Sequence, residues 1–290
     1  MEKITFTSIY PYTAYKLKID PKIKEIIQSD NWLILRQSMD TFHWEEMRIL
    51  KYLVANNKQN LFKNLMISYD FDLSIENNIF LSIAVANGSY DVIEYLLQNG
   101  VNANTSNNTA IKLASAANHQ QCLKLLIDNG ADIHFDNNFP LKQAAYFGLI
   151  DNIKILVENG ANIRTTNDYP IRIAGHHDHI LKYLISHGAD ISADNYYVLR
   201  NCVQKNYYQS IKILLEAGAN IGVLSMDDLI RVINKDSYQT LQLLMEYGVD
   251  FSIVNQYDNN KNNISRIVNL LVSNGIDPKK MALIYGSHRW

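Results

Sequence analysis

The sequence predicts an all-α solenoid of stacked helix-turn-helix units with short loops. Two observations predict it: a glycine returns about every 30 residues, and the same helical pattern of apolar residues precedes each one. Repetition at such a period is typical of chains in which each unit buries its apolar face against the next. The 290 residues are 47% hydrophobic, which is enough for a core of this kind.

The recurring glycine sets the phase of the units. It stands at Gly100, Gly130, Gly160, Gly188, Gly218, Gly248 and Gly275. Leucine lies four residues before every one of these glycines, and other apolar residues lie seven and three residues before it. These offsets fall on one face of an α-helix. Glycine just beyond a helix can take the left-handed conformation that ends it. Each unit therefore contains a helix with an apolar stripe and a defined end.

A turn and another helix complete the unit. Two residues after each glycine comes Asn or Asp, whose side chain can bond its own backbone and fix a turn. About ten residues after the glycine a helix begins, most clearly at Pro140 and Pro170, because proline is tolerated in a first helical turn. Alanines such as Ala144 and Ala145 then allow close packing against neighbouring helices.

The ends of the chain depart from this phase, and we expect three segments. Residues 1–42 are predicted to form an N-terminal helical cap, residues 43–277 about eight repeats, and residues 278–290 a C-terminal capping helix. The cap would contain helices over 22–29 and 32–39, with apolar residues that include Leu33 covering the first repeat. A degenerate first unit has Asp70 at the glycine position, because Asp tolerates the left-handed conformation.

Read together, Pro-Leu-x-x-Ala-Ala followed by Ile-x-x-Leu-x-x-x-Gly-Ala-Asp resembles the ankyrin repeat, over about residues 43–285. The resemblance implies a non-enzymatic scaffold that binds a protein partner of unknown identity. The shorter, Asn-rich units look most like the ankyrin-repeat proteins of giant DNA viruses of amoebae, which implies a viral effector acting on host proteins. A second hypothesis is a substrate-recruiting adaptor of a ubiquitin ligase. We interpret the abundance of Asn and Ile as the imprint of an A/T-rich genome.

Two features differ from the family pattern. The period is about 30 residues instead of about 33, and the missing residues fall in the loop after the glycine, so this loop should be short. The family's Thr and His positions hold other residues, such as Phe139 with Lys142 and Tyr169 with Arg172. The hydrogen bonds that these two residues usually supply between repeats must be made otherwise or not at all.

The resemblance places partner binding at the outward end of the first helix of each unit and in the loops. Residues at this end differ from repeat to repeat, whereas the core positions barely change. The candidates are Tyr146, Phe147, His176, His177, Gln204 and Lys205. In the loops, Tyr169, Tyr196 and Tyr197 either extend an aromatic patch or fill the space left by the shortened loops. Both interpretations of these three tyrosines stay open.

Residues with catalytic or metal-binding chemistry are few. The run from His176 to His179 has the residue types of a transition-metal site, but consecutive side chains in a turn point in different directions, which favours a solvated turn. Cys122 and Cys202 are 80 residues apart, and we expect buried thiols that act as small hydrophobes. Neither GxxxxGK[ST] nor GxGxxG occurs. We therefore expect no catalytic residue, no cofactor and no metal.

Charge and hydropathy limit the partners further. A formal net charge of -2 provides no basic excess for a nucleic-acid backbone. No apolar stretch approaches the ~18 residues of a membrane-spanning helix. With two cysteines and no leader-like N-terminal pattern, we expect an intracellular, cytoplasmic monomer, in the host cytoplasm if the protein is viral.

Overall fold

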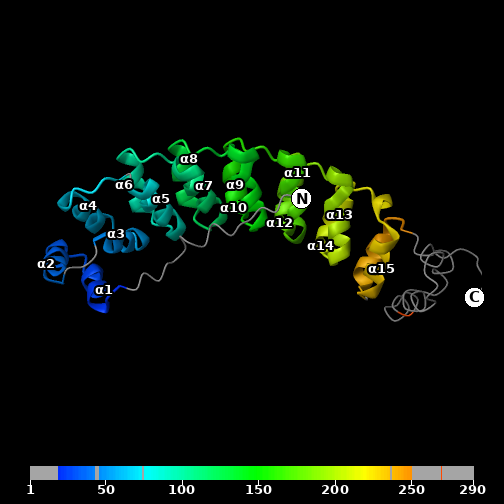
Figure 1. Cartoon of the computed structure of the whole chain (residues 1–290). Coiled ribbons are helices and arrows are strands. Elements are labelled where there is room, and N and C mark those ends of the chain that lie inside the picture. Colours follow the sequence, from blue (N-terminus) through cyan, green and yellow to red (C-terminus); the bar gives the residue numbers. More distant parts are fainter. Residues whose placement is uncertain (1–18, 43–45, 74, 236, 250–268, 270–290) are drawn as a thin grey trace, which may run out of the picture. The chain divides into compact units, whose positions relative to one another are not determined.

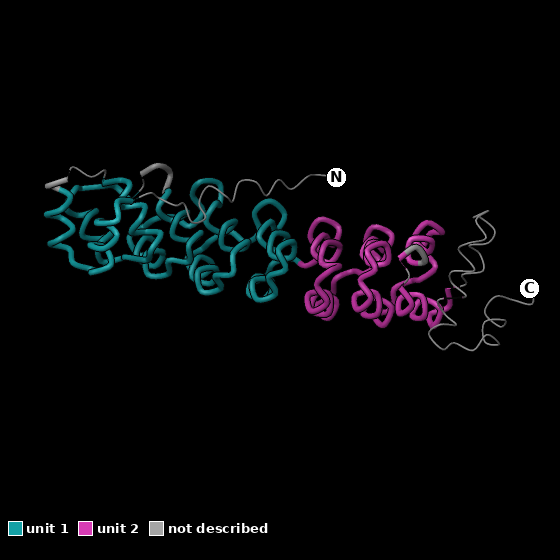
Figure 2. Tube along the Cα trace, turned by 90° about the horizontal axis from the view of Figure 1, so that it is seen from below, with its two compact units in different colours: residues 1–162 teal, residues 163–290 magenta. Residues whose placement is uncertain are grey.

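The structure is a computed structural model that describes residues 19–42, 46–73, 75–235, 237–249 and 269. All the regular structure in these ranges is helical and none is strand, which confirms the predicted all-α class. The chain divides into two compact units, residues 1–162 and residues 163–290 (Figure 2). Gly275 and the predicted capping helix over 278–290 lie outside the described residues.

Unit 1 contains ten described helices (Figure 1). Their bounds are α1 Pro21–Gln28, α2 Trp32–Phe42, α3 Glu46–Ala55, α4 Gln59–Ser68, α5 Ile75–Asn87, α6 Tyr90–Gln98, α7 Thr105–Ala116, α8 Gln120–Asp128, α9 Phe135–Tyr146 and α10 Ile150–Glu158. From α3 onward, successive helices pair into four hairpins. Their first helices, α3, α5, α7 and α9, pack side by side in one layer, and α4, α6, α8 and α10 form a second layer.

Unit 2 continues the same pattern in its described part. Its elements are α11 Thr165–Ile173, the 3-10 turn η2 Ala174–His176, α12 Asp178–Ser186, α13 Ala193–Lys205, α14 Tyr208–Glu216, the 3-10 turn η3 Ile221–Val223, α15 Met226–Asn234 and α16 Tyr238–Glu246. The layers are again first helices against first helices (α11, α13, α15) and second against second (α12, α14, α16). The 3-10 turn η2 closes the first helix of the shortened, 28-residue unit between Gly160 and Gly188.

The core confirms the register read from the glycine phase. The leucines four residues before the described glycines are fully buried, at 0% exposure: Leu96, Leu126, Leu156, Leu184, Leu214 and Leu244. The glycines themselves have φ between +81° and +95°, the left-handed region, and Asp70 takes the same conformation with φ of 50°. The predicted turn is present as well. The Asp132 carboxylate, for example, accepts a hydrogen bond of 2.8 Å from the backbone N–H of His134.

The loop between each glycine and the next helix contains an unpredicted element. Three consecutive residues with left-handed backbone stand within the bounds of α7, α9, α11 and α13, ahead of the right-handed helix. In α9 they are Asp136, Asn137 and Asn138, with φ of 46°, 54° and 56°. Asn and Asp occupy nine of these twelve positions, and they tolerate this conformation better than other residues with a side chain. Part of the Asn abundance therefore has a structural cause, which the composition alone did not reveal.

These left-handed turns make the inter-repeat bonds that the missing Thr and His do not. The Asn138 side chain accepts a hydrogen bond of 2.9 Å from the backbone N–H of Asn162, one repeat later. In unit 2, Asp168 accepts one of 2.7 Å from the N–H of Asp190 in the same way. The carbonyls are satisfied too, since Lys142 Nζ, at the family's His position, donates to the Asp136 carbonyl at 3.0 Å. The replacements noted in the sequence thus supply bonds of their own.

A second polar connection joins the second helices α10, α14 and α16 to their preceding repeats. In each described repeat a buried position lies eight residues before the recurring glycine, and this position is polar in three of the repeats. Asn152 donates to the carbonyls of the turn that follows α7. Ser210 donates to Asp178 Oδ1, and Thr240 donates to Asn206 Oδ1 at 2.6 Å. Neighbouring repeats are therefore held by specific polar bonds as well as by apolar contact.

The N-terminal helices lie close to their predicted positions. Within α1 and α2, Ile23, Ile27, Leu35 and Met39 are buried. Leu33 is not, because it lies on the outer side of α2 with 74% of its surface exposed. The expectation that Leu33 covers the first repeat was wrong, and its neighbours on the buried face of α2 provide the apolar contact instead.

Candidate functional site

In unit 1, Tyr146 and Phe147 lie at the C-terminal end of α9 and form an exposed aromatic pair. Their ring centroids are 5.2 Å apart in an edge-to-face arrangement, and 47% and 41% of their surfaces are exposed. Both side chains at the end of this first helix are therefore accessible to solvent. At the equivalent places in α7, Ala116 and Ala117 are small and only half-exposed. Among the described repeats, only this one has a Tyr-Phe pair at the end of its first helix.

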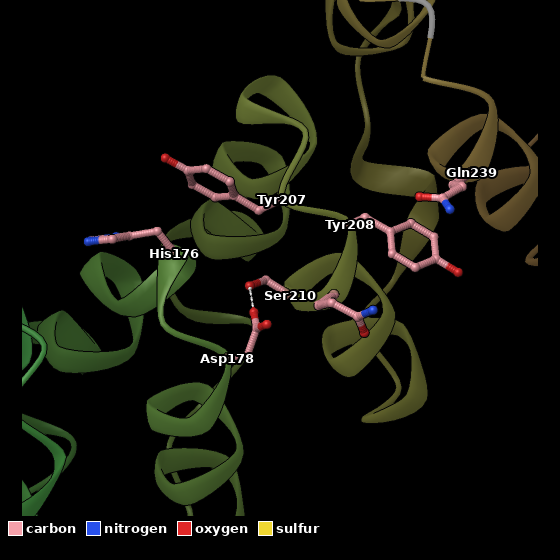
Figure 3. Close-up of a pocket in the computed structure, with 7 residues that line it drawn as sticks. His176, Asp178, Tyr207, Tyr208, Ser210 and Gln239 are labelled. Carbon is pink, nitrogen blue, oxygen red and sulfur yellow. Dashed lines mark hydrogen bonds between the residues drawn. The ribbon is translucent and has the colours of Figure 1, made fainter.

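In unit 2, the turns between first and second helices of successive repeats line a pocket of about 410 Å³ (Figure 3). Its lining residues are His176, Asp178, Tyr207, Tyr208, Gln209, Ser210 and Gln239. They come from the end of η2, the start of α12, the N-cap and start of α14, and the start of α16. Figure 3 shows the hydrogen bond from the Ser210 hydroxyl to Asp178 at the centre, with Tyr207 and Tyr208 projecting on opposite sides. One predicted residue, His176, belongs to this pocket.

The histidine run forms a cluster of rings rather than a ligand set. The His176 and His177 ring centroids are 3.8 Å apart, and those of His177 and His179 are 6.1 Å apart. Within the described residues, no three His, Cys, Asp or Glu side chains gather so that they could hold a metal ion. Partial burial lowers the pKa of His177, and the neighbouring His176 and His179 lower it further.

Gln204 and Lys205 are the last two residues of α13, and Gln204 forms hydrogen bonds within the protein. The Gln204 amide donates to Asp228 Oδ1 at 2.7 Å, and its backbone carbonyl accepts from Lys235 Nζ at 2.8 Å. Lys205 is exposed. Of this predicted pair, Lys205 is thus the residue that reaches solvent.

The three loop tyrosines, Tyr169, Tyr196 and Tyr197, are all half-buried. Tyr196 is the last residue of a left-handed turn, with φ of 54°. The Arg172 guanidinium lies over the Tyr197 ring, 5.2 Å from its centroid, and also pairs with Asp194 at 2.9 Å. A half-buried ring beneath an arginine can both fill space between repeats and present an edge to a partner, so its position fits both interpretations.

Both cysteines are buried, and neither has the surroundings of a nucleophile. Burial raises the pKa of the Cys122 thiol to about 11 and that of Cys202 to about 12. Cys202 Sγ also donates to the Gly175 carbonyl at 3.3 Å. Reactive thiols need a lowered pKa and access to solvent, so these two act as core residues, as predicted.

Sequence reasoning missed Asp178, Tyr207, Tyr208 and Gln239 as lining residues of one pocket. Asp178 was singled out only within the histidine run, and the Tyr-Tyr dipeptide carried a usable signal, since adjacent aromatics at a turn are rarely both buried. The pocket depends on residues from three consecutive turns lying side by side.

This arrangement defines a class: a helical repeat protein in which antiparallel helix pairs stack and present variable side chains along their turns. The family described as ankyrin repeats in three copies matches the chain over residues 49–137, 81–167 and 141–225, which is more than half of the 290 residues. The chain belongs to the ankyrin-repeat family. Ankyrin-repeat domains are generally protein-protein interaction modules and are typically non-catalytic.

Two solved structures illustrate the likeness of fold. The human ASB11 ankyrin repeat domain is 21% identical, with a TM-score of 0.51 over 59% of this chain and 84% of that one. The ankyrin repeat domain of Bcl-3, a member of the IkappaB protein family, is 21% identical, with a TM-score of 0.52 over 64% of this chain and 97% of that one. No curated protein matches the chain. These comparisons give no evidence of a viral origin.

No helix in the described ranges combines the length and the apolar character needed to cross a bilayer.

Proposed function

We propose that this chain is a non-enzymatic interaction scaffold that binds a protein partner at the turn ends of its first helices. The observation that carries the proposal is the Tyr146–Phe147 pair, two large aromatic side chains that lie edge to face and remain more than 40% exposed. Aromatic residues are enriched among those that dominate binding energy at interfaces. A rigid pair in this place loses little side-chain entropy on binding, because each ring already restricts the other.

Unit 2 would contribute its own contacts to the same partner or to another one. His176, His177 and Lys205 lie at or near the corresponding helix end. Tyr169, Tyr196 and Tyr197 lie near the opposite, N-terminal ends of α11 and α13, at or just after the left-handed turns. Gln204 would take part only if its bond to Asp228 were exchanged. These residues differ between repeats while the buried leucines do not, which is the pattern expected of a shared scaffold with a particular surface.

The finer features of the proposal rest on the sequence. A viral effector acting on host proteins is supported by the short, Asn-rich repeats, and the structural role of Asn in the left-handed turns reduces that support. An intracellular location is supported by the low cysteine content. The ubiquitin-ligase alternative gains no support from the described residues.

The test is affinity purification with mass spectrometry from the cells that naturally contain the protein. Wild type is compared with a Tyr146→Ala/Phe147→Ala double variant. The matched control is Leu33→Ala/Ile34→Ala, which removes exposed apolar side chains, 74% and 46% accessible, from α2 of the same unit.

A partner that is lost with the aromatic variant and kept with the control supports both the scaffold and its site. A partner kept with both variants means that the scaffold binds elsewhere. If no partner is captured with any of the three proteins, the interaction hypothesis loses its main support.

A further inference from the structure

Asp178 is the negative charge that lines the pocket of unit 2, and it has no cationic partner there. Other carboxylates of the described part of unit 2 do: Arg164 pairs with both Asp168 and Asp190, at 3.3 Å and 2.9 Å, and Arg172 pairs with Asp194 at 2.9 Å. Asp178 is half-buried, and the hydrogen bond to its Oδ1 comes from the neutral Ser210 hydroxyl. Among the described residues, no lysine or arginine forms an ion pair with it.

Aromatic rings and neutral polar groups line the same pocket as this carboxylate. Tyr207 lies with its ring centroid 6.2 Å from that of His176, and Tyr208 lines the pocket next to Gln239 (Figure 3). Ring faces attract cations through their quadrupole, and an amide oxygen can accept a hydrogen bond from an ammonium or guanidinium group. None of the lining residues is a lysine or an arginine.

We propose that this pocket receives a lysine or arginine side chain of the protein partner. The inference rests on the scaffold function proposed above and deepens it, because it names the chemistry of one contact. The cation would pair with the open side of the Asp178 carboxylate and lie against the tyrosine rings. A volume of about 410 Å³ is ample for one such side chain.

Two helix ends fix the position of this carboxylate in the free protein. Asp178 is the first residue of α12, and the Ser210 bond brings it to the start of α14. Helix N-termini carry partial positive charge and stabilise an anion within the first turn. The carboxylate is therefore fixed in position by the start of α12 and by the Ser210 hydroxyl, and its negative charge disfavours an anionic ligand in the pocket.

The experiment titrates the full chain, labelled with ¹⁵N, with four small probes. These are N-acetyl-arginine amide, N-acetyl-lysine amide, the neutral isostere N-acetyl-citrulline amide, and N-acetyl-glutamate amide. The readout is the backbone amide shift of Ser210 and Gln239. We expect the arginine and lysine probes to bind with a Kd on the order of millimolar, as small ligands of this size do, and the citrulline and glutamate probes to cause no saturable shift.

Two variants and a control locate the binding. Asp178→Asn should weaken arginine binding roughly tenfold, the usual effect of losing a charged hydrogen bond. Tyr208→Leu should weaken it about threefold. Asp194→Asn, at the carboxylate already paired with Arg172, should leave the affinity unchanged. Far-UV circular dichroism checks that each variant is folded, and Tyr208→Leu carries the test if Asp178→Asn is not.

Citrulline binding equal to arginine binding, or unchanged affinity in folded Asp178→Asn, would overturn the proposal. So would the absence of any shift with the arginine probe at tens of millimolar. None of these results touches the partner capture through Tyr146 and Phe147, so the failure of this inference and the failure of the scaffold function are separate outcomes.

Discussion

Asn152 offers the sharpest test of how neighbouring repeats are joined. It lies in α10 with 0% exposure, and its Nδ2 donates to the carbonyls of Ala114, Ser115 and Ala117 at 3.1, 3.2 and 2.8 Å. Substitution Asn152→Ala removes this donor and leaves the end of α7 without its bond to the next repeat. The loss is severe because a buried carbonyl without a partner costs about 1–3 kcal/mol.

The net magnitude follows from opposing contributions. Two Nδ2 hydrogens serve the three carbonyls, so no more than two full bonds are lost, at about 1 kcal/mol each, with desolvation of the freed carbonyls added. In the other direction, the substitution removes the Asn152 Oδ1, a buried acceptor with no partner among the described residues. We expect unfolding free energy to fall by about 2–3 kcal/mol.

Asn159→Ala in the same helix is the matched control. Asn159 is exposed, and its Nδ2 donates only to the Ile155 carbonyl at the helix end, at 2.8 Å. Its loss should cost about 0.5–1 kcal/mol. Urea unfolding followed by circular dichroism at 222 nm measures both, with the midpoint read together with the slope. If Asn152→Ala shifts the midpoint no more than Asn159→Ala does, the polar connection between repeats contributes nothing beyond an ordinary surface bond.

Three further outcomes are expected. Leu156→Ala, at a fully buried position, should cost roughly 2–5 kcal/mol in urea unfolding, whereas Tyr146→Ala should change stability by less than about 0.5 kcal/mol; a neutral Leu156→Ala would contradict the repeat register. Iodoacetamide at pH 8 should label Cys122 and Cys202 at least ~100-fold more slowly in the native protein than in urea, because burial raises the two thiol pKa values to about 11 and about 12. Equal rates would show that the thiols are not in a core. The lowered pKa of His177 means that the unfolded chain binds this proton more readily, so stability is complete above about pH 6.5 and falls as the pH drops below it. Thermal unfolding at pH 7.5 and 5.5 measures the loss, which His177→Gln should reduce, and a variant with the wild-type pH dependence would assign it to another group.

The repeat architecture could be predicted because its signals are local. The spacing between Leu156 and Gly160 reports one helix face and one helix end, and both depend on backbone geometry within a few residues. Because the pattern recurs in seven copies, a motif that is weak on its own defines the register of the repeats. The turn made by Asp132 was predictable for the same reason, since its partner is two residues away.

The left-handed turns and the pocket could not be predicted in this way. Asn137-Asn138 is a short polar pair with no periodic pattern, and its conformation is stabilised by Lys142 in the same repeat and by Asn162 in the next. The pocket requires Asp178 and Ser210 to meet across a repeat boundary, and helix periodicity says nothing about contacts between repeats. The helix-end candidates were chosen at one fixed position in each repeat. They therefore included His176 but missed the other residues that line the pocket with it.

The polar position eight residues before the glycine also bears on how such a chain can evolve. Asn152 matches the open carbonyls of the turn after α7, Ser210 matches the carboxylate of Asp178, and Thr240 matches the amide of Asn206. Each of these repeats carries a group suited to its own predecessor. A recombination that exchanged two repeats would place a donor opposite the wrong acceptor even though the apolar stripes still fitted. These pairings therefore fix the order of the repeats. Duplication of one repeat would need compensating substitutions in the next repeat.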